Sequence, residues 1–198
     1  MNSFIKFFAS NQFIINSFFI ILIAGTLFMG FKPKESFISL DVKPFALVEL
    51  YTSEGCSSCP PADKLLTNLV DQANKNDLNL FALSFHVSYW DYLGWKDPFA
   101  SEAFTNRQKR YARKLGSGVY TPQMVVNGQV EFVGSNKKEA ERVINNALSV
   151  YSTKIKIDHV NFRKDGTKVY IDFKIAGSNS GMIANIALVE RNLDISVN

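Results

Sequence analysis

Two short apolar runs with a helical pattern between them open the folded part of the chain. Phe45–Thr52, which a Ser-Glu-Gly turn follows, and Leu78–Val87 are runs of the kind that forms buried strands. Between them, Ala62–Asn74 places leucines at helical spacing behind Pro60 and Pro61, which a first helical turn tolerates. Because the connection is long enough for a helical crossover, the pattern predicts a parallel βαβ unit.

The stretch from Asp97 to Gly116 has the pattern of an amphipathic helix. Asp97 and Pro98 form a typical helix start, with the aspartate as N-cap and the proline at the first helical position. Apolar residues continue at three- and four-residue spacing to Leu115, where Gly116 ends the helix. A solvated helix face is the expected role of its basic residues, Arg107, Lys109, Arg110, Arg113 and Lys114.

A hairpin and another helix follow. Asn127-Gly128 is a strong hairpin signal, and the apolar runs Gln123–Val126 and Gln129–Val133 flank it. The apolar stripe of Lys137–Tyr151 predicts a helix.

Beyond Ser152 the apolar period changes to two residues, which indicates strands. Two strands are predicted around the turn Lys164–Gly166, a third over Met182–Glu190 and the start of a fourth over Asp194–Val197. This part is therefore expected to be a β-rich extension.

The N-terminus is expected to direct export. Phe7–Phe31 contains no charged residue and follows Lys6, so it suits the apolar region of a signal peptide. As a helix it would be roughly 37 Å long, which also allows a membrane anchor. Both interpretations place the rest of the chain outside the cytoplasm, either soluble after cleavage or attached to the membrane.

Composition indicates a globular protein, and the patterns described above divide the chain into four parts. Apolar residues make up 46% and charged residues 20% of the 198 residues. Residues 32–198 carry 21 basic and 18 acidic side chains, and this mild, scattered excess argues against a nucleic-acid partner. We expect a signal peptide or anchor at 1–31, a linker at 32–44, an α/β domain at 45–151 and the β-rich extension at 152–198.

The two cysteines, Cys56 and Cys59, stand in a C-x-x-C motif where the first strand gives way to the helix. Unpaired backbone N–H groups and the positive end of the helix dipole stabilise a thiolate at such a position. Cys56 is therefore the expected nucleophile. Cys59, one turn into the helix, is suited to resolve a mixed disulfide.

Two other roles of this cysteine pair stay open. A structural clip gains only about 2 kcal/mol from closing so short a loop, which is a poor way to stabilise a fold. A metal site of Cys56, Cys59 and His86 is short of a fourth ligand for structural zinc, because the other histidine, His159, lies in the β-rich extension. A soft metal such as copper suits these ligands better. We expect no stoichiometric metal and no other cofactor.

His86 and Pro122 are further candidate site residues. Parallel strands end on the same side of a sheet, so His86, near the end of the second strand, is expected close to Cys56. There it either shuttles protons or is a packed core histidine. Thr121-Pro122 enters the hairpin and is a candidate for a cis peptide bond.

Four aromatic residues gather in the segment Ser88–Trp95. They predict either a well-packed loop or a wall beside the cysteines. Thr121, Tyr89, Trp90 and Trp95 are the expected substrate contacts.

The order of these elements resembles the thioredoxin fold over residues 45–151. The segments VELYTSEGCSSCPPADKLL, FHVSYWDYLGWKDPF, RQKRYA and YTPQMVVNG are more narrowly similar to an exported thioredoxin-like family catalogued as domain of unknown function 1223. The resemblance covers nearly all of 45–198. It implies an α/β, thioredoxin-like domain with a β-rich C-terminal extension, and since family members continue past Asn198, an extension that is truncated here.

The resemblance also implies roles for three residues. Cys56 would be the nucleophile, Cys59 the resolving thiol and Pro122 a cis-proline that faces them. The motif departs from the usual thioredoxin sequence, because Gly55 replaces a tryptophan and two serines, Ser57-Ser58, stand between the cysteines. These departures leave substrate packing and redox potential open.

The leading hypothesis is an exported thiol–disulfide oxidoreductase that acts on protein thiols or disulfides and exchanges electrons with a redox partner. Its catalytic residues would be Cys56, Cys59, Pro122 and His86. A copper-binding or copper-delivery protein that uses the cysteines and His86 is one alternative. A non-catalytic interaction module is another.

Overall fold

A mixed four-stranded sheet lies at the centre of residues 43–150 in the computed structural model, which describes residues 43–150, 155–177 and 185–190. The strand order is β2-β1-β3-β4. The strands are β1 (Ala46–Thr52), β2 (Leu80–His86), β3 (Gln123–Val126) and β4 (Val130–Val133). β1 pairs with β2 in parallel and with β3 in antiparallel orientation, and β3 pairs with β4 in antiparallel orientation.

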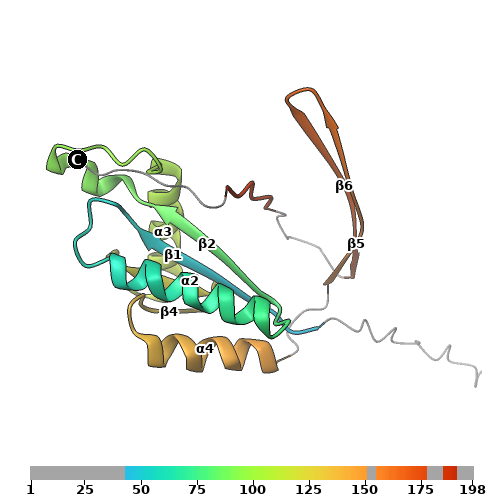
Figure 1. The fold of residues 1–198 in the computed structure, drawn as a ribbon, viewed down its shortest axis with the longest axis horizontal. Helices are drawn as coiled ribbons and strands as arrows, with labels where there is room; N and C mark the ends of the chain where they lie inside the picture. Colours follow the sequence, from blue (N-terminus) through green and yellow to red (C-terminus); the bar gives the residue numbers. More distant parts are fainter. Residues whose placement is uncertain (1–42, 151–154, 178–184, 191–198) are drawn as a thin grey trace, which may run out of the picture. The chain divides into compact units, whose positions relative to one another are not determined.

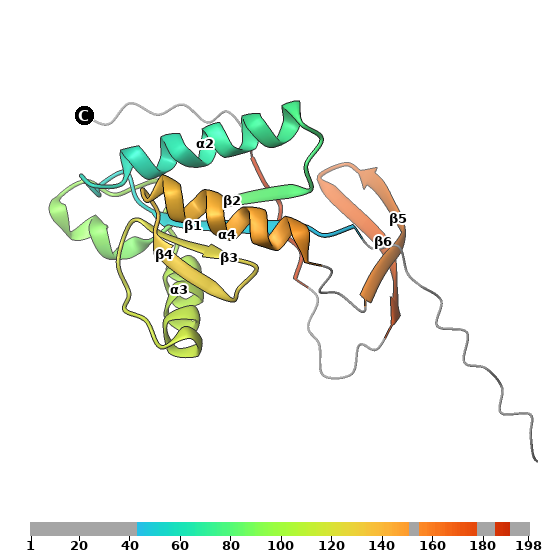
Figure 2. The ribbon, with the colours of Figure 1, turned by 90° about the horizontal axis from the view of Figure 1, so that it is seen from below.

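Helices cover both faces of this sheet (Figures 1 and 2). The covering elements are α2 (Pro60–Lys75) and α4 (Lys137–Ser149) on one face, and α3 (Glu102–Leu115) and the 3-10 helix η1 (Ser88–Leu93) on the other. Alternate residues of β1 serve the two faces: Val48 and Leu50 pack against α2 and α4, whereas Tyr51 packs toward α3. The predicted α/β class and the parallel βαβ unit are confirmed.

The predicted hairpin is also confirmed. Asn127 and Gly128 have φ angles of 50° and 62°, in the left-handed region that this residue pair tolerates. The Asn127 side chain accepts a hydrogen bond from the backbone N–H of Leu47 and donates one to the carbonyl of Phe45. The turn is thereby joined to the start of β1.

The prediction for the start of α3 is wrong. The helix begins at Glu102, and its N-cap is Ser101, whose hydroxyl accepts a hydrogen bond from the N–H of Ala103. Asp97 does not cap this helix, because its buried carboxylate binds groups elsewhere in the fold. The predicted end of α3 is confirmed, since Gly116 has a φ of 68°.

The expectation that Cys59 lies one turn inside the first helix is also wrong. The helix starts at Pro60, and Cys59 is its N-cap residue rather than a residue one turn inside it. The N–H groups of Ala62 and Asp63 bond the Cys59 carbonyl, and Pro60 and Pro61 fill the first two helical positions, where no N–H group is needed.

Two further strands, β5 (Ile155–Asp165) and β6 (Lys168–Gly177), form an antiparallel hairpin, as predicted. The strand predicted over Met182–Glu190 is wrong for its described part, because residues 185–190 are not in a strand. A period of two residues only indicates which side chains share a face, and a strand also needs a paired neighbour. Residues 182–184 and the predicted strand Asp194–Val197 lie outside the described residues.

The predicted signal peptide or anchor, residues 1–31, lies outside the described residues, as does most of the predicted linker. Within the part of the chain that the structure describes, no helix is long and apolar enough to cross a membrane.

Candidate functional site

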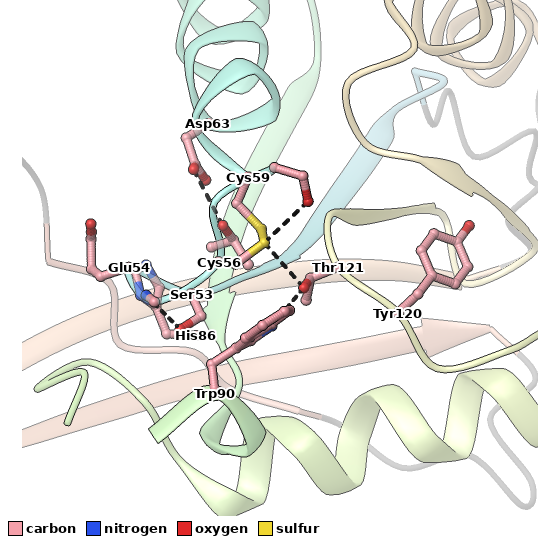
Figure 3. Close-up of a disulfide and its surroundings, with 12 residues drawn as sticks. Ser53, Glu54, Cys56, Cys59, Asp63, His86, Trp90, Tyr120 and Thr121 are labelled. Atoms are coloured by element: carbon pink, nitrogen blue, oxygen red, sulfur yellow. Dashed lines mark hydrogen bonds between the residues drawn. A yellow bond between two sulfur atoms is a disulfide. The ribbon is translucent and has the colours of Figure 1, made fainter. Parts of the chain in front are cut away.

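Cys56 and Cys59 form a disulfide at the carboxyl end of β1 (Figure 3). Their sulfur atoms are 2.09 Å apart and their Cα atoms 5.4 Å apart. The turn that holds them is built from two backbone hydrogen bonds, from Cys56 N–H to the Ser53 carbonyl and from Cys59 N–H to the Cys56 carbonyl. Both cysteines are buried, and Cys59 is fully buried. The structure thus brings together the two residues that the motif predicts.

Thr121 lies directly against this disulfide. Its hydroxyl donates a hydrogen bond of 3.2 Å to Cys56 Sγ and accepts one of 2.8 Å from Trp90 Nε1. The Thr121–Pro122 peptide bond is cis, as the sequence predicts. Ser58 Oγ also lies 3.5 Å from Cys56 Sγ. Cys56 Sγ therefore has two hydroxyl neighbours, whereas no hydrogen bond to Cys59 Sγ is present among the described residues.

Two residues that the sequence analysis missed hold the segment around Thr121 in place. The N–H of Gly134 donates to the Pro122 carbonyl at 2.9 Å, and a Cβ atom at Gly134 would lie 3.2 Å from Pro122 Cβ. The buried Gln108 side chain donates from Nε2 to the Tyr120 carbonyl at 2.7 Å. A lone glycine and a helical glutamine carry no signal of these roles in the sequence.

The aromatic segment lies beside the disulfide, and its residues differ in their contacts. Trp90 reaches Thr121, and the ring of Tyr89 lies 6.3 Å from that of Trp90. Tyr92 also stacks on Trp90 and is 76% exposed. Trp95 is half-buried and makes no hydrogen bond to Thr121 or to either cysteine. The structure thus brings Trp90 and Tyr89 to the site, and Tyr92 is the exposed aromatic surface next to them.

His86 ends β2 opposite Thr52 of β1, and its partner is a buried carboxylate. His86 Nδ1 lies 2.7 Å from Asp97 Oδ2. Asp97 also accepts hydrogen bonds from the N–H of Glu54 at 2.8 Å and of Phe99 at 2.9 Å. Burial alone would raise the pKa of Asp97, but these backbone hydrogen bonds and the contact with His86 outweigh it and hold the pKa below its ordinary value. Asp97 is therefore an ionised residue that joins the cysteine turn to β2.

Asp63, in the first turn of α2, is a second carboxylate near the disulfide (Figure 3). Its Oδ2 accepts a hydrogen bond of 3.2 Å from the hydroxyl of the buried Thr52. Burial raises the pKa of Asp63, and the negative charge of Glu54 adds to the increase. The hydrogen bond from Thr52 and the charge of His86 oppose this increase only in part. The sequence analysis missed Asp63, because an acidic residue in a first helical turn is common for reasons of helix stability alone.

These side chains do not form a metal centre. Within the described residues, no group of three or more histidine, cysteine, aspartate or glutamate side chains has the geometry to hold a metal ion. The structure therefore gives no geometric support to a copper site of Cys56, Cys59 and His86.

Arg107 does not lie on a solvated face, so that expectation is wrong for this residue. Its guanidinium forms two hydrogen bonds of 2.7 Å with the buried carboxylate of Glu49 in β1. The hydroxyls of Tyr51 and Tyr111 donate to the same carboxylate at 3.0 and 2.9 Å. Glu49 lies on the face of β1 that packs against α3, where it is buried. A buried carboxylate is costly without a cation, and Arg107 of α3 supplies that cation.

Comparisons with known proteins place this chain in a family without giving it an activity. It is 37% identical to protein AGR_C_4864 from Agrobacterium tumefaciens, whose crystal structure it matches with a TM-score of 0.47 over 65% of this chain and 55% of that one. It is 12% identical to HBP35 of Porphyromonas gingivalis, with a TM-score of 0.42 over 62% of this chain and 38% of that one. This chain thus spans little more than half the length of the Agrobacterium protein.

No protein of curated function matches the chain. A family whose description is "Protein of unknown function (DUF1223)" matches residues 47–198. This match covers the sheet except for Ala46, the first residue of β1, together with the disulfide and the β5–β6 hairpin. The chain therefore belongs to the DUF1223 family of proteins of unknown function.

Proposed function

We propose that this protein is a thiol–disulfide oxidoreductase with a thioredoxin-like domain. The observation that carries the proposal is the Cys56–Cys59 disulfide with the Thr121 hydroxyl on Cys56 Sγ. A hydroxyl that donates to this sulfur also stabilises the thiolate that forms when the disulfide is reduced. The order of elements, with a parallel βαβ unit followed by α3, an antiparallel hairpin and α4, supports the thioredoxin-like assignment.

The proposed reaction is exchange with a substrate dithiol. A substrate thiolate attacks Cys56 Sγ, the Cys56–Cys59 bond breaks, and Cys59 leaves as a thiolate that takes up a proton. The second substrate thiolate then attacks its own sulfur in the mixed disulfide and releases Cys56. The substrate is oxidised by two electrons and the protein disulfide is reduced by two. The reverse sequence reduces a substrate disulfide.

Trp90, Tyr89 and Thr121 are the proposed substrate contacts. Trp90 and Thr121 are joined by a hydrogen bond, and Thr121 also bonds Cys56 Sγ, so both lie next to the sulfur that the proposed substrate attacks. The exposed ring of Tyr92 extends the same surface, and it replaces Trp95 in the set proposed from the structure. Aromatic side chains of this kind bind apolar segments of a polypeptide.

The proposed location is outside the cytoplasm. The uncharged segment Phe7–Phe31 behind Lys6 supports export. Disulfides such as Cys56–Cys59 persist in oxidising compartments, where protein thiols and a redox partner are the proposed reactants.

A turnover assay tests the proposal. A catalytic amount of the protein is mixed with a reduced dithiol peptide and oxidised glutathione, and the peptide disulfide is followed by mass spectrometry. We expect several peptides to be oxidised per protein molecule, with no acceleration by Cys56→Ser. Two outcomes would show that the bond is a structural clip. In one, the disulfide is reduced once and no further peptide is oxidised. In the other, Cys56→Ser accelerates peptide oxidation as much as the unmodified protein does.

A further inference from the structure

The 3-10 helix η1 lies directly against the turn that carries Cys56. A Cβ atom on Gly55, the residue before Cys56, would lie 3.3 Å from Trp90 Cβ and 3.7 Å from the Trp90 carbonyl oxygen. Glycine at position 55 therefore lets the two segments approach closely. Trp90 also donates to Thr121, whose hydroxyl donates to Cys56 Sγ (Figure 3). η1 thus reaches the surroundings of the disulfide by two separate contacts.

A buried aspartate connects the other side of η1 to the same turn. Asp97, which is 1% exposed, donates its backbone N–H to Oδ1 of the half-buried Asp91 in η1 at 3.2 Å. The carboxylate of Asp97 accepts hydrogen bonds from the N–H of Glu54 at 2.8 Å and from Ser53 Oγ at 3.3 Å. The Ser53 carbonyl in turn accepts a hydrogen bond from Cys56 N–H. Asp97 therefore joins η1 to the cysteine turn.

These hydrogen bonds close a ring around η1. The ring runs from Cys56 through Thr121 and η1 to Asp97, and it returns through the cysteine turn. A 3-10 helix has poor internal hydrogen-bond geometry, and η1 is only six residues long. The position of η1 is therefore determined by these contacts rather than by its own backbone.

The ring of hydrogen bonds holds an aromatic stack in place, formed by Tyr89, Trp90 and Tyr92. The rings of Trp90 and Tyr92 are 6.5 Å apart and inclined by only 16°, and Tyr92 at the end of the stack is 76% exposed. Contacts of 3.2 and 2.8 Å link Cys56 Sγ to Trp90 through Thr121. An extended substrate chain whose sulfur meets Cys56 therefore reaches Tyr92 within about three residues.

We propose that η1 selects polypeptide substrates that carry an aromatic side chain within about three residues of the reacting cysteine. The substrate ring stacks on Tyr92 and lengthens the aromatic stack. Asp91 is a positioning residue for this selection, because it holds η1 in place through its bond with Asp97. The inference rests on the proposed redox function and names its substrate class.

The reaction that tests this selection is the reduction of a peptide disulfide by the reduced protein. The Cys56 thiolate attacks one peptide sulfur, and the peptide S–S bond breaks. The Cys59 thiolate then attacks Cys56 Sγ and releases the peptide. Two electrons pass from the protein to the peptide. The two protein thiols lose their protons to solvent, and the two peptide thiolates take up protons from solvent.

Single-turnover kinetics of the full chain measure the selection. Reduced protein is mixed with disulfide-bridged peptides that carry a phenylalanine one, two or three residues before or after one cysteine. The reference peptide has alanine at all these positions. Quenched samples are weighed by mass spectrometry to obtain the rate constant for each peptide. We expect the most reactive phenylalanine peptide to exceed the reference roughly threefold to tenfold, because stacking favours its binding.

Three variants of η1 and two controls test which residues produce this ratio. Tyr92→Ala removes the exposed ring and Asp91→Ala removes the acceptor for Asp97 N–H, so both should lower the ratio to about 1. Asp91→Asn keeps an oxygen that accepts this bond and should restore the ratio. Phe162→Ala and Asp71→Ala change exposed residues of β5 and α2 and should leave the ratio unchanged. A general loss of folded protein would slow both peptides equally, so it does not alter the ratio.

The outcomes separate this inference from the proposed function. Equal rate constants for all peptides, or a ratio that survives in Tyr92→Ala, would overturn the selection and leave the redox function standing. A ratio that survives in Asp91→Ala would overturn the positioning role of Asp91. If that variant does not fold, a ratio lost in Asp91→Asn as well as in Tyr92→Ala would overturn that role. No reduction of any peptide by the unmodified protein would overturn the redox function and the selection together.

Discussion

Glu49 and Asp63 are both carboxylates that the fold takes out of bulk water, but they differ in their partners. Glu49, beneath α3, accepts two hydrogen bonds from Arg107 and one each from Tyr51 and Tyr111. Asp63, beside the disulfide, accepts one hydrogen bond, from Thr52. The first carboxylate has a cation and four donors, whereas the second shares its surroundings with the negative charge of Glu54.

This difference in partners is reflected in the pKa values of the side chains around each carboxylate. The hydrogen bonds with Glu49 raise the pKa of Arg107 above its ordinary value, and burial together with Glu49 raises the pKa of Tyr111 to about 12. Arg107 and the hydroxyls of Tyr51 and Tyr111 therefore keep their protons between pH 5 and 9. The pKa of Asp63, by contrast, is raised by burial and by the negative charge of Glu54, and the hydrogen bond from Thr52 and the charge of His86 offset this only in part.

Breaking the Glu49 cluster should have the largest effect. Arg107→Ala leaves Glu49 buried without a cation, and we expect the free energy of unfolding to fall by about 3 kcal/mol. Urea denaturation followed by circular dichroism measures it. Arg110→Ala, an exposed position on the same helix, should change it by less than about 0.5 kcal/mol. Equal losses in the two variants would contradict the structural role of the cluster.

Thr121→Val should have an intermediate effect at the disulfide. It removes the donor to Cys56 Sγ and the acceptor of Trp90 Nε1, so we expect a loss of about 1 kcal/mol in stability and a higher pKa of the reduced Cys56 thiol. The rate of alkylation of Cys56 near pH 6 should fall roughly threefold to tenfold, which mass spectrometry can follow. Thr121→Ser keeps the hydroxyl and should restore the rate. If Thr121→Val reacts as fast as the unmodified protein, the hydroxyl does not activate this sulfur.

Asp63→Asn should have the smallest effect on stability, and in the opposite direction. Because burial raises the pKa of Asp63 in the folded state, the folded protein holds this proton more tightly than the unfolded chain. The stabilisation that comes from this tighter proton binding is therefore fully present below about pH 4, and it is lost as the pH rises through the folded-state pKa of Asp63. We expect Asp63→Asn to be more stable than the unmodified protein at pH 7 and to show a flatter dependence above pH 4. Urea denaturation at several pH values measures this, and a less stable variant at pH 7 would contradict it.

The sequence predicts the frame of the fold well, because local signals agree with it. The Asn127-Gly128 turn, the Gly116 helix end and the C-x-x-C motif before Pro60 each act over a few residues. These local signals mark where the strands and helices begin and end, and the apolar patterns between them are consistent with few arrangements of the sheet.

The errors come from residues whose partners are distant in sequence. Asp97 before Pro98 has the local signal of an N-cap, but its carboxylate instead binds Glu54 and His86, more than ten residues away in each case. Arg107 has the pattern of an exposed residue, but Glu49 in β1 recruits it. In both cases a buried charge needs a partner, and only the tertiary fold determines which one it finds.

Trapping a mixed disulfide tests the central claim most directly. The Cys59→Ser variant, with its serine well suited to the N-cap position, is mixed with a peptide that carries one disulfide, and the products are separated without reductant and mapped by mass spectrometry. We expect one peptide joined to Cys56, and no stable adduct in the Cys56→Ser variant. Adducts through Cys59 that form as fast as those through Cys56, or no adduct in either variant, would contradict the assignment of Cys56 as the thiol that exchanges with substrate.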